Sequence, residues 1–427
     1  MDLDGWIVQQ VRRSAAAMEQ AISATHLVRY RAAFDQIVRP LPGSVLASPV
    51  IADWNPEPDY FFHWLRDSAI AMRAVAELMQ GAPSVEERNR WRRHFEDFVR
   101  FSLQLNNLDG ADLLDKNSYR EVTNPECRKF LRDDDDLRAL TGEKVFGEPR
   151  FNPDGTIDFL RWSRPQFDGP ALRALACLRY LEAGGEKTGE LARLMKLDLD
   201  FTRRHAGKPC IGPWEEPGQS AHHYYVALVQ LGALVHGRAW AGVAAREWTA
   251  AEDKLRAALD RHWSEKQQAY LPISPEPADG ALDAACLLAV WDADLPDGPH
   301  SVEDQRVQMT QKAIEDYFTR EFPINRGRTA PALGRYCGDR YFGGGAWYPT
   351  TLAAAGLCYR LARNPGQDRD ALIQRGDAFM ATVRDLTPAD GALSEQVDRE
   401  TGKQTSARHL SWSYAAFISA ARERSKD

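Results

Sequence analysis

The sequence of 427 residues predicts an all-α protein whose helices form two concentric rings. Helical stretches of two kinds alternate along the chain, one heavily charged with a narrow apolar stripe and one apolar almost all round. The connections alternate too, because links from apolar to charged stretches are short and links back are long and rich in Gly, Pro, Trp and Asp. A helix that is apolar on all sides must be enclosed by other helices. The apolar stretches therefore predict an inner ring and the charged stretches an outer one.

The charged stretches show helical spacing of their apolar residues. Trp91, Phe95 and Phe98 fall at i, i+4 and i+7 behind Ser84 and Glu87, which stand at capping-box spacing. With the amino-terminal segment counted first, the expected outer helices lie in residues 3–22, 84–101, 190–204, 244–263, 302–320 and 367–386. The expected inner helices lie in residues 68–79, 171–183, 222–237, 280–293, 346–362 and 411–421. The sequence thus predicts twelve helices in strict alternation.

A closed ring and an open helical solenoid would both show this alternation. A solenoid has a recognisable repeat length, and the sequence has no repeat of fixed period, so the ring is favoured. In an antiparallel ring alternate connections lie on the same face. All the long loops should therefore gather at one end, as expected for a binding face.

The overall charge and composition exclude several classes of partner. The formal net charge is -7 and there is no basic tract, so we expect no nucleic-acid partner. No apolar run approaches the roughly 20 residues of a membrane span, and the first residues lack the apolar core of a signal peptide. The six cysteines form no CxxC motif and are expected as free thiols in a reducing compartment. These features predict a cytoplasmic protein, unless an export leader has been removed.

Side chains suited to binding a polar ligand gather in the long loops. The stretch DYFFHWLRDSA contributes Tyr60, Trp64, Arg66 and Asp67, and the next long loop contributes Trp162. Aromatic rings there could stack on a ligand, while Arg66 and Asp67 could bind neighbouring hydroxyls. Taken singly, each loop is equally compatible with a salt-bridged helix start and core aromatics.

Two adjacent glutamates, Glu215 and Glu216, follow Trp214 in a loop rich in Pro and Gly. Successive side chains on an extended backbone diverge, so the two should have separate tasks. Trp214 offers an apolar wall that would keep the Glu215 carboxyl protonated. Two surface glutamates near a helix N-terminus would fit the same sequence.

The last loops carry Arg335, Trp347 and Glu395. Glu395 lies between turn signals, where a lone glutamate is ordinarily exposed unless something pairs with it. GxSxG, HExxH, P-loop and GxGxxG motifs are missing from the sequence, and we expect neither a metal nor a cofactor. Trp and Tyr beside Arg, Asp and Glu are typical of a sugar site, and two carboxyls on separate loops suggest glycoside hydrolysis.

Several of these runs together resemble glycoside hydrolase family 15, the glucoamylases and their relatives. The matching runs include ASPVIADWNPEPDYFFHWLRDSA, WSRPQFDGPALRA, WEE, GRY and DGALSEQVDRETGKQTSARHLSWSYAA, in family order. The resemblance implies an (α/α)6 barrel, with residues 1–427 as a single catalytic domain and no separate carbohydrate-binding module. It implies an inverting, exo-acting α-glucosidase that releases β-D-glucose from non-reducing ends of α-glucan oligosaccharides.

The resemblance also implies a role for each site residue. Glu215 would be the general acid and Glu395 the general base. Glu216, Arg66, Asp67 and Arg335 would bind sugar hydroxyls, and the aromatic lining would be Tyr60, Trp64, Trp162, Trp214 and Trp347. The family often has Asp where this chain has Gly212, so the preferred linkage stays open: α-1,6-linked glucans or trehalose are alternatives. A non-catalytic sugar-binding barrel is the alternative from another class, and the oligomeric state is not indicated.

Overall fold

The computed structural model describes residues 2–53, 56–116, 119–218, 220–276 and 280–426. Twelve helices of nine or more residues within these ranges build the body of the molecule. Six form the inner ring: α2 (Leu65–Gln80), α7 (Asp168–Glu182), α9 (Tyr224–His236), α11 (Ala285–Ala293), α13 (Tyr348–Ala362) and α15 (Ser411–Arg424). Six form the outer ring: α1 (Leu3–Glu19), α3 (Val85–Leu105), α8 (Gly189–Arg204), α10 (Ala245–Leu259), α12 (Gln305–Glu321) and α14 (Arg369–Leu386).

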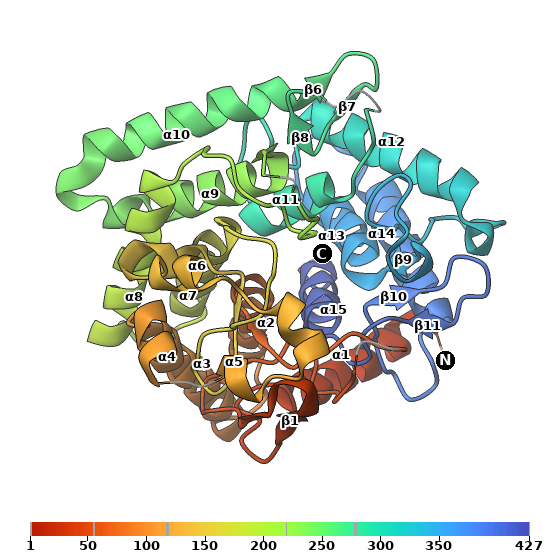
Figure 1. Ribbon diagram of the computed structural model, residues 1–427. Helices are drawn as coiled ribbons and strands as arrows, with labels where there is room; N and C mark the ends of the chain where they lie inside the picture. Colours follow the sequence, from red (N-terminus) through yellow and green to blue (C-terminus); the bar gives the residue numbers. More distant parts are fainter. Residues whose placement is uncertain (1, 54–55, 117–118, 219, 277–279, 427) are drawn as a thin grey trace.

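The inner helices close on themselves. Each packs against the next inner helix along the chain, and α15 packs back against α2. Each outer helix covers one inner helix, with α1 against α15, α3 against α2 and so on around the ring. In Figure 1 the colours run around the molecule in sequence order, and red α1 lies beside blue α15. The predicted (α/α)6 barrel is therefore confirmed.

The two kinds of helix bury different fractions of their surface. In α3 the stripe of Trp91, Phe95 and Phe98 is buried, and the Ser84 hydroxyl accepts the Glu87 N–H at 3.1 Å as the N-cap. In α13 nearly every residue is buried. Gly356 allows α13 to approach α11, since a Cβ there would lie 2.1 Å from the ring of Trp291.

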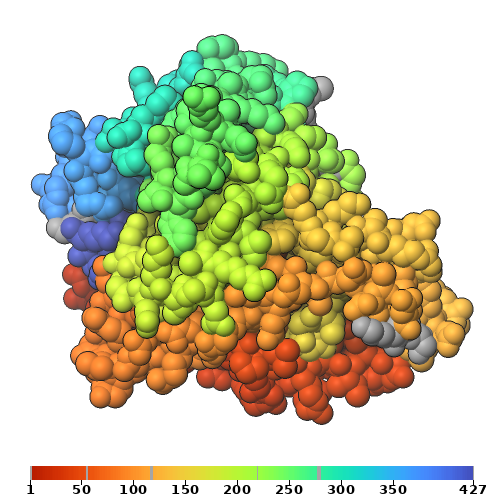
Figure 2. Space-filling model, turned by 90° about the vertical axis from the view of Figure 1, so that its left-hand side faces the viewer, coloured from red at the N-terminus to blue at the C-terminus, as the bar shows by residue number. Residues whose placement is uncertain are grey.

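The long loops meet at one end of the barrel, where the inner helices begin. Two strand pairs and one three-stranded sheet lead into three of these helices. The pairs are β3 (His63–Trp64) with β4 (Arg150–Phe151) and β5 (His222–His223) with β8 (Ile273–Ser274), and in the sheet β10 (Gln396–Val397) lies between β9 (Ala346–Trp347) and β11 (Gln404–Thr405). The connection from α3 to α7 adds three short helices, α4 (Gly110–Lys116), α5 (Tyr119–Val122) and α6 (Asp134–Arg138). These orange and yellow residues project along one side of the space-filling view (Figure 2).

Elsewhere on the molecule, two further strand pairs lie outside the rings: β1 (Arg29–Arg31) with β2 (Gln36–Val38), and β6 (Trp263–Ser264) with β7 (Ala269–Tyr270). All six cysteines are free, and Cys177, Cys210, Cys286 and Cys358 are buried. Within the described ranges, the helices include none that is long and apolar enough to cross a lipid bilayer.

Candidate active site

A cavity of about 720 Å³ opens among the long loops. All the side chains singled out in the sequence line it, and they come from the first turn of α2 and from the loops before α2, α7, α9, α13 and α15. They are Tyr60, Trp64, Arg66, Asp67, Trp162, Trp214, Glu215, Glu216, Arg335, Trp347 and Glu395. The fold thus brings residues from widely separated parts of the chain into one site.

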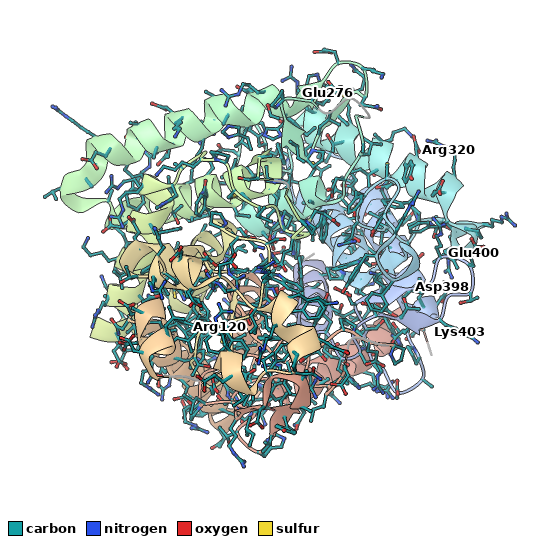
Figure 3. The ribbon with its side chains drawn as sticks, viewed as in Figure 1. Arg120, Glu276, Arg320, Asp398, Glu400 and Lys403 are labelled. Carbon is teal, nitrogen blue, oxygen red and sulfur yellow. The ribbon has the colours of Figure 1, made fainter. Side chains whose placement is uncertain are left out.

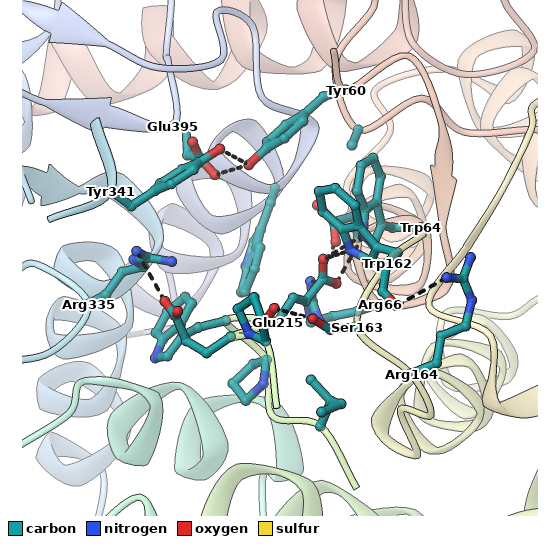
Figure 4. A pocket seen from close by; sticks show the side chains of 18 of the residues that line it. Tyr60, Trp64, Arg66, Trp162, Ser163, Arg164, Glu215, Arg335, Tyr341 and Glu395 are labelled. Carbon is teal, nitrogen blue, oxygen red and sulfur yellow. Dashed lines mark hydrogen bonds and ion pairs between the residues drawn. The ribbon is translucent and has the colours of Figure 1, made fainter. Parts of the chain in front are cut away.

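Glu215 lies on one wall of this cavity and accepts several hydrogen bonds (Figure 4). Trp64 Nε1 donates to its Oε1 at 3.0 Å, Trp162 Nε1 donates to its Oε2, and Arg66 Nη2 lies 3.0 Å from Oε1. The backbone of Glu215 is left-handed, with φ at 62°, and the Ser163 hydroxyl donates to its carbonyl oxygen at 2.6 Å. A non-glycine residue holds such a conformation only when its surroundings enforce it.

The predicted apolar wall of Trp214 beside the Glu215 carboxyl stays a prediction, and the contacts of the Trp214 indole lie with other residues. The Trp214 N–H donates to Asp283, 3.0 Å and 2.9 Å from its two oxygens, and the ring packs edge-on against Trp347. Since consecutive side chains diverge, the tryptophans that reach the carboxylate come from other loops. Trp64 and Trp162 direct polar N–H groups at Glu215.

A buried cluster of charges surrounds Arg66. Besides Glu215, its guanidinium lies 3.4 Å from Asp168 and 3.6 Å from Asp67, and it donates to Gln166 at 3.1 Å. Burial raises the pKa of Asp67 to about 6, against the opposing effect of the Arg66 charge. Asp67 Oδ2 has no hydrogen-bond partner among the described residues. This buried oxygen of a cavity-lining residue is suited to accept a hydrogen bond from a ligand in the cavity.

Glu395 lies on a different side of the cavity and is buried, with 3% of its surface exposed. Tyr60 donates to its Oε1 at 3.0 Å and Ser406 donates to its Oε2. The Tyr60 hydroxyl also lies 2.7 Å from that of Tyr341. Burial raises the pKa of Glu395 to about 7, although the hydroxyl donors and the positive charge of Arg335 oppose this effect.

The two carboxyls face the cavity from different sides (Figure 4). Glu395 lies with Tyr60 and Tyr341, while Glu215 lies with Trp64 and Trp162. The rings of Tyr60 and Trp64, 5.2 Å apart, connect the two groups. Each carboxyl therefore has its own set of donors, with the cavity between them.

Glu216 has surroundings different from those of Glu215. It accepts the Tyr336 hydroxyl at 2.7 Å and lies 3.8 Å from Arg335 Nη2. Arg335 is held by a bidentate pair with Asp339, at 2.7 Å and 2.6 Å. The adjacent glutamates thus contact different neighbours, as diverging side chains should.

Sequence reasoning did not select several residues that line or support the cavity. Tyr341 and Trp412 line it; Trp412 stands within the run DGALSEQVDRETGKQTSARHLSWSYAA, and Tyr341 follows five residues after the GRY run. Tyr341 directly follows Arg340, which was the available signal for it, whereas Trp412 stands between two serines. Gly212 is close to His223: a Cβ at residue 212 would lie 2.5 Å from the His223 ring. A side chain at residue 212 would therefore require that ring to move.

Known proteins match most of this chain. The family described as glycosyl hydrolases family 15 matches residues 28–107 and 127–422. Glucoamylase-1 of Schizophyllum commune is 27% identical over 433 residues, which cover 90% of this chain and 69% of the relative. A probable glucoamylase of Schizosaccharomyces pombe is 26% identical over 425 residues, covering 89% of this chain and 84% of the relative.

Solved structures show the same architecture. The glucoamylase structure from Hormoconis resinae aligns with a TM-score of 0.78 and 25% identity, covering 99% of this chain and 74% of that one. The glucoamylase structure from Saccharomycopsis fibuligera aligns with a TM-score of 0.77 and 23% identity, covering 100% of this chain and 96% of that one.

Proposed function

Because this chain belongs to glycosyl hydrolases family 15, we propose that it is an inverting, exo-acting α-glucosidase of the glucoamylase type. It releases β-D-glucose from the non-reducing ends of α-glucan oligosaccharides. The observation that carries this proposal is the placement of Glu215 and Glu395 on different sides of one aromatic-lined cavity. The relatives named glucoamylase support the choice of an α-linked glucose chain as substrate.

In the proposed reaction Glu215, protonated in the productive complex, donates its proton to the glycosidic oxygen. Glu395, ionised, removes a proton from a water molecule on the opposite face of the sugar. Single displacement of this kind needs carboxyls about 6.5–9.5 Å apart, so that the water fits between base and sugar. The negative charges of neighbouring carboxylates stabilise the oxocarbenium-like transition state.

The remaining residues of the cavity position the sugar. Arg66, Asp67, Glu216 and Arg335 are proposed to bind its hydroxyls, and the unpartnered oxygen of Asp67 supports this role. The aromatic side chains stack on the apolar faces of the pyranose rings. These are Tyr60, Trp64, Trp162, Trp214 and Trp347.

The experiment is glucose release from maltose, isomaltose and trehalose, each at the same concentration, with Glu215→Gln as the inactive control. We expect maltose to be the preferred substrate. Preference for isomaltose or trehalose would retain the mechanism and change the linkage. Binding of sugars without release from any of the three would contradict the enzyme proposal and favour a non-catalytic sugar-binding barrel.

We further propose that residues 1–427 act as one catalytic domain in the cytoplasm. The continuous double ring supports the first point, and the buried free thiols are compatible with a reducing compartment. Fractionation of the native source with a glucose-release assay tests the location.

A further inference from the structure

Asp283 is a buried acid behind the cavity, just before α11, and only 5% of its surface is exposed. It is not among the residues that line the cavity. Both of its carboxylate oxygens accept the N–H of Trp214, at 3.0 Å and 2.9 Å, and Oδ1 also accepts the N–H of Ala285 at 2.6 Å. The same carboxylate thus binds the loop of the adjacent glutamates and the first turn of an inner helix.

The backbone around Asp283 holds a second loop of the site. The N–H of Ala284 donates to the carbonyl of Arg335 at 2.7 Å, and the N–H of Cys337 donates to the carbonyl of Leu282 at 3.0 Å. Asp283 and Tyr336 are therefore paired in an antiparallel β-bridge of the backbone, and the Tyr336 hydroxyl donates to Glu216. Through side chain and backbone together, this one residue connects the loops before α9 and α13.

The position of Glu215 depends on how firmly Trp214 is held. Glu215 follows Trp214 directly and has the left-handed backbone described above. Trp214 also packs against Trp347 and lies 5.5 Å below the Arg335 guanidinium. Of these contacts, only the bond to Asp283 fixes the rotation of the indole through its polar edge.

We propose that Asp283 is a positioning residue for hydrolysis, which sets the Glu215 carboxyl by anchoring the Trp214 indole. The inference rests on the proposed function of Glu215 as general acid. Burial raises the pKa of Asp283 to about 7, and the hydrogen bonds from Ala285 and Trp214 oppose this effect because they favour the carboxylate.

A double-mutant cycle tests this proposal against a purely structural role in capping α11. Asp283→Asn keeps Oδ1 for the Ala285 N–H, but it removes the negative charge and replaces Oδ2, which accepts the Trp214 N–H at 2.9 Å, with an amide NH2 that cannot accept. Trp214→Phe keeps an aromatic ring and removes the donor. We expect Asp283→Asn to lower kcat for maltose about 10- to 100-fold, the range for a hydrogen bond to a charged group. KM should change less than kcat, because the groups proposed to bind sugar hydroxyls are unchanged.

In the Trp214→Phe background, Asp283→Asn should change kcat by less than about threefold, because the bond is already lost. Equal fold-changes of kcat in both backgrounds would overturn the proposal and leave only the helix-capping role. A kcat within about twofold of wild type for folded Asp283→Asn would also overturn it. If Asp283→Asn does not fold, a wild-type kcat in the single variant Trp214→Phe would overturn the proposal.

The same cycle separates this proposal from that of the overall function. Wild-type protein that releases no glucose from any of the three disaccharides contradicts the function. The cycle is then measured as the Kd for maltose by tryptophan fluorescence. Non-additive changes in Kd would still support the anchoring of Trp214 by Asp283, and additive changes would refute it.

Discussion

The two carboxyls that face the cavity have opposite surroundings. Glu215 lies on a loop with a left-handed backbone, against a guanidinium and two indole N–H groups. Glu395 is next to a short strand, deeply buried, and accepts hydroxyls from Tyr60 and Ser406. Burial acts on Glu395 strongly enough to raise its pKa to about 7. The difference shows that the donors to each carboxyl come from residues distant in the sequence, Trp64 and Trp162 for Glu215 and Tyr60 for Glu395.

The largest effect expected is the loss of turnover when either carboxyl is replaced. Glu215→Gln and Glu395→Gln should each lower kcat by about 10²–10⁴-fold, the contribution of a positioned acid or base. Ligand binding should change far less, because the amide is isosteric. The measurement is glucose release from maltose together with maltose binding by tryptophan fluorescence.

Glu400→Gln is the matched control for these two substitutions. Glu400 is exposed on the hairpin that follows Glu395 and lies at the edge of the molecule with Asp398 and Lys403 (Figure 3). This variant should retain wild-type kcat. Near-normal turnover in Glu215→Gln or Glu395→Gln would make the corresponding role untenable.

Removal of the Arg66 guanidinium tests whether the surroundings of Glu215 depend on this positive charge. Arg66→Met leaves Glu215, Asp67 and Asp168 without the guanidinium that they share. Breaking a buried ion pair from one side typically destabilises a protein by about 3–5 kcal/mol. Urea unfolding should show a loss in this range, whereas Arg320→Met at the outer edge of α12 should have little effect (Figure 3). An unchanged unfolding free energy would mean that these carboxyls do not depend on Arg66.

The stability of Glu395→Gln tests how much the burial of a charged carboxylate at Glu395 costs. The ordinary pKa of a glutamate is 4.5, and that of Glu395 in the fold is about 7. The folded state therefore holds an extra proton between these values, so wild-type stability falls as the pH rises through this window. At pH 8 Glu395→Gln should be more stable than wild type by about 1–3 kcal/mol. At pH 4.5 or below the gain should disappear, and a gain of equal size at both pH values would refute its electrostatic origin.

Ser406→Ala should change activity least, and only through the pH dependence of kcat/KM. The Ser406 hydroxyl donates to Glu395 and lowers its pKa, so its removal should raise that pKa further. A general base must be ionised, and activity should therefore fall on the acid side of a pH profile of kcat/KM. In Ser406→Ala this acid limb should move to higher pH by less than about one unit. A shift toward lower pH would contradict the hydrogen bond as described.

The fold was predictable because helix patterning is a local property of the sequence. Trp91, Phe95 and Phe98 mark the buried stripe of α3, and the almost wholly apolar inner segments require enclosure. The short helices α4, α5 and α6 were not predicted, because segments of four to seven residues carry too little periodicity.

The sequence predicted which residues line the candidate site better than it predicted which partners they contact. Arg66, Glu216 and Arg335 were selected by residue type within long loops, and these residues line the cavity. The partners of Trp214 and Glu215 could not be predicted, since Asp283 and Trp162 reach them from other loops. Such contacts depend on how the loops fold over the barrel end, which the local sequence does not specify.

The configuration of the released glucose tests the central claim most directly. If Glu215 and Glu395 act from opposite sides of the sugar, hydrolysis of an α-linked substrate in one displacement inverts the anomeric carbon. Proton NMR during the first minutes of turnover on maltose should therefore show β-D-glucose forming ahead of mutarotation. Initial formation of α-D-glucose would contradict the account.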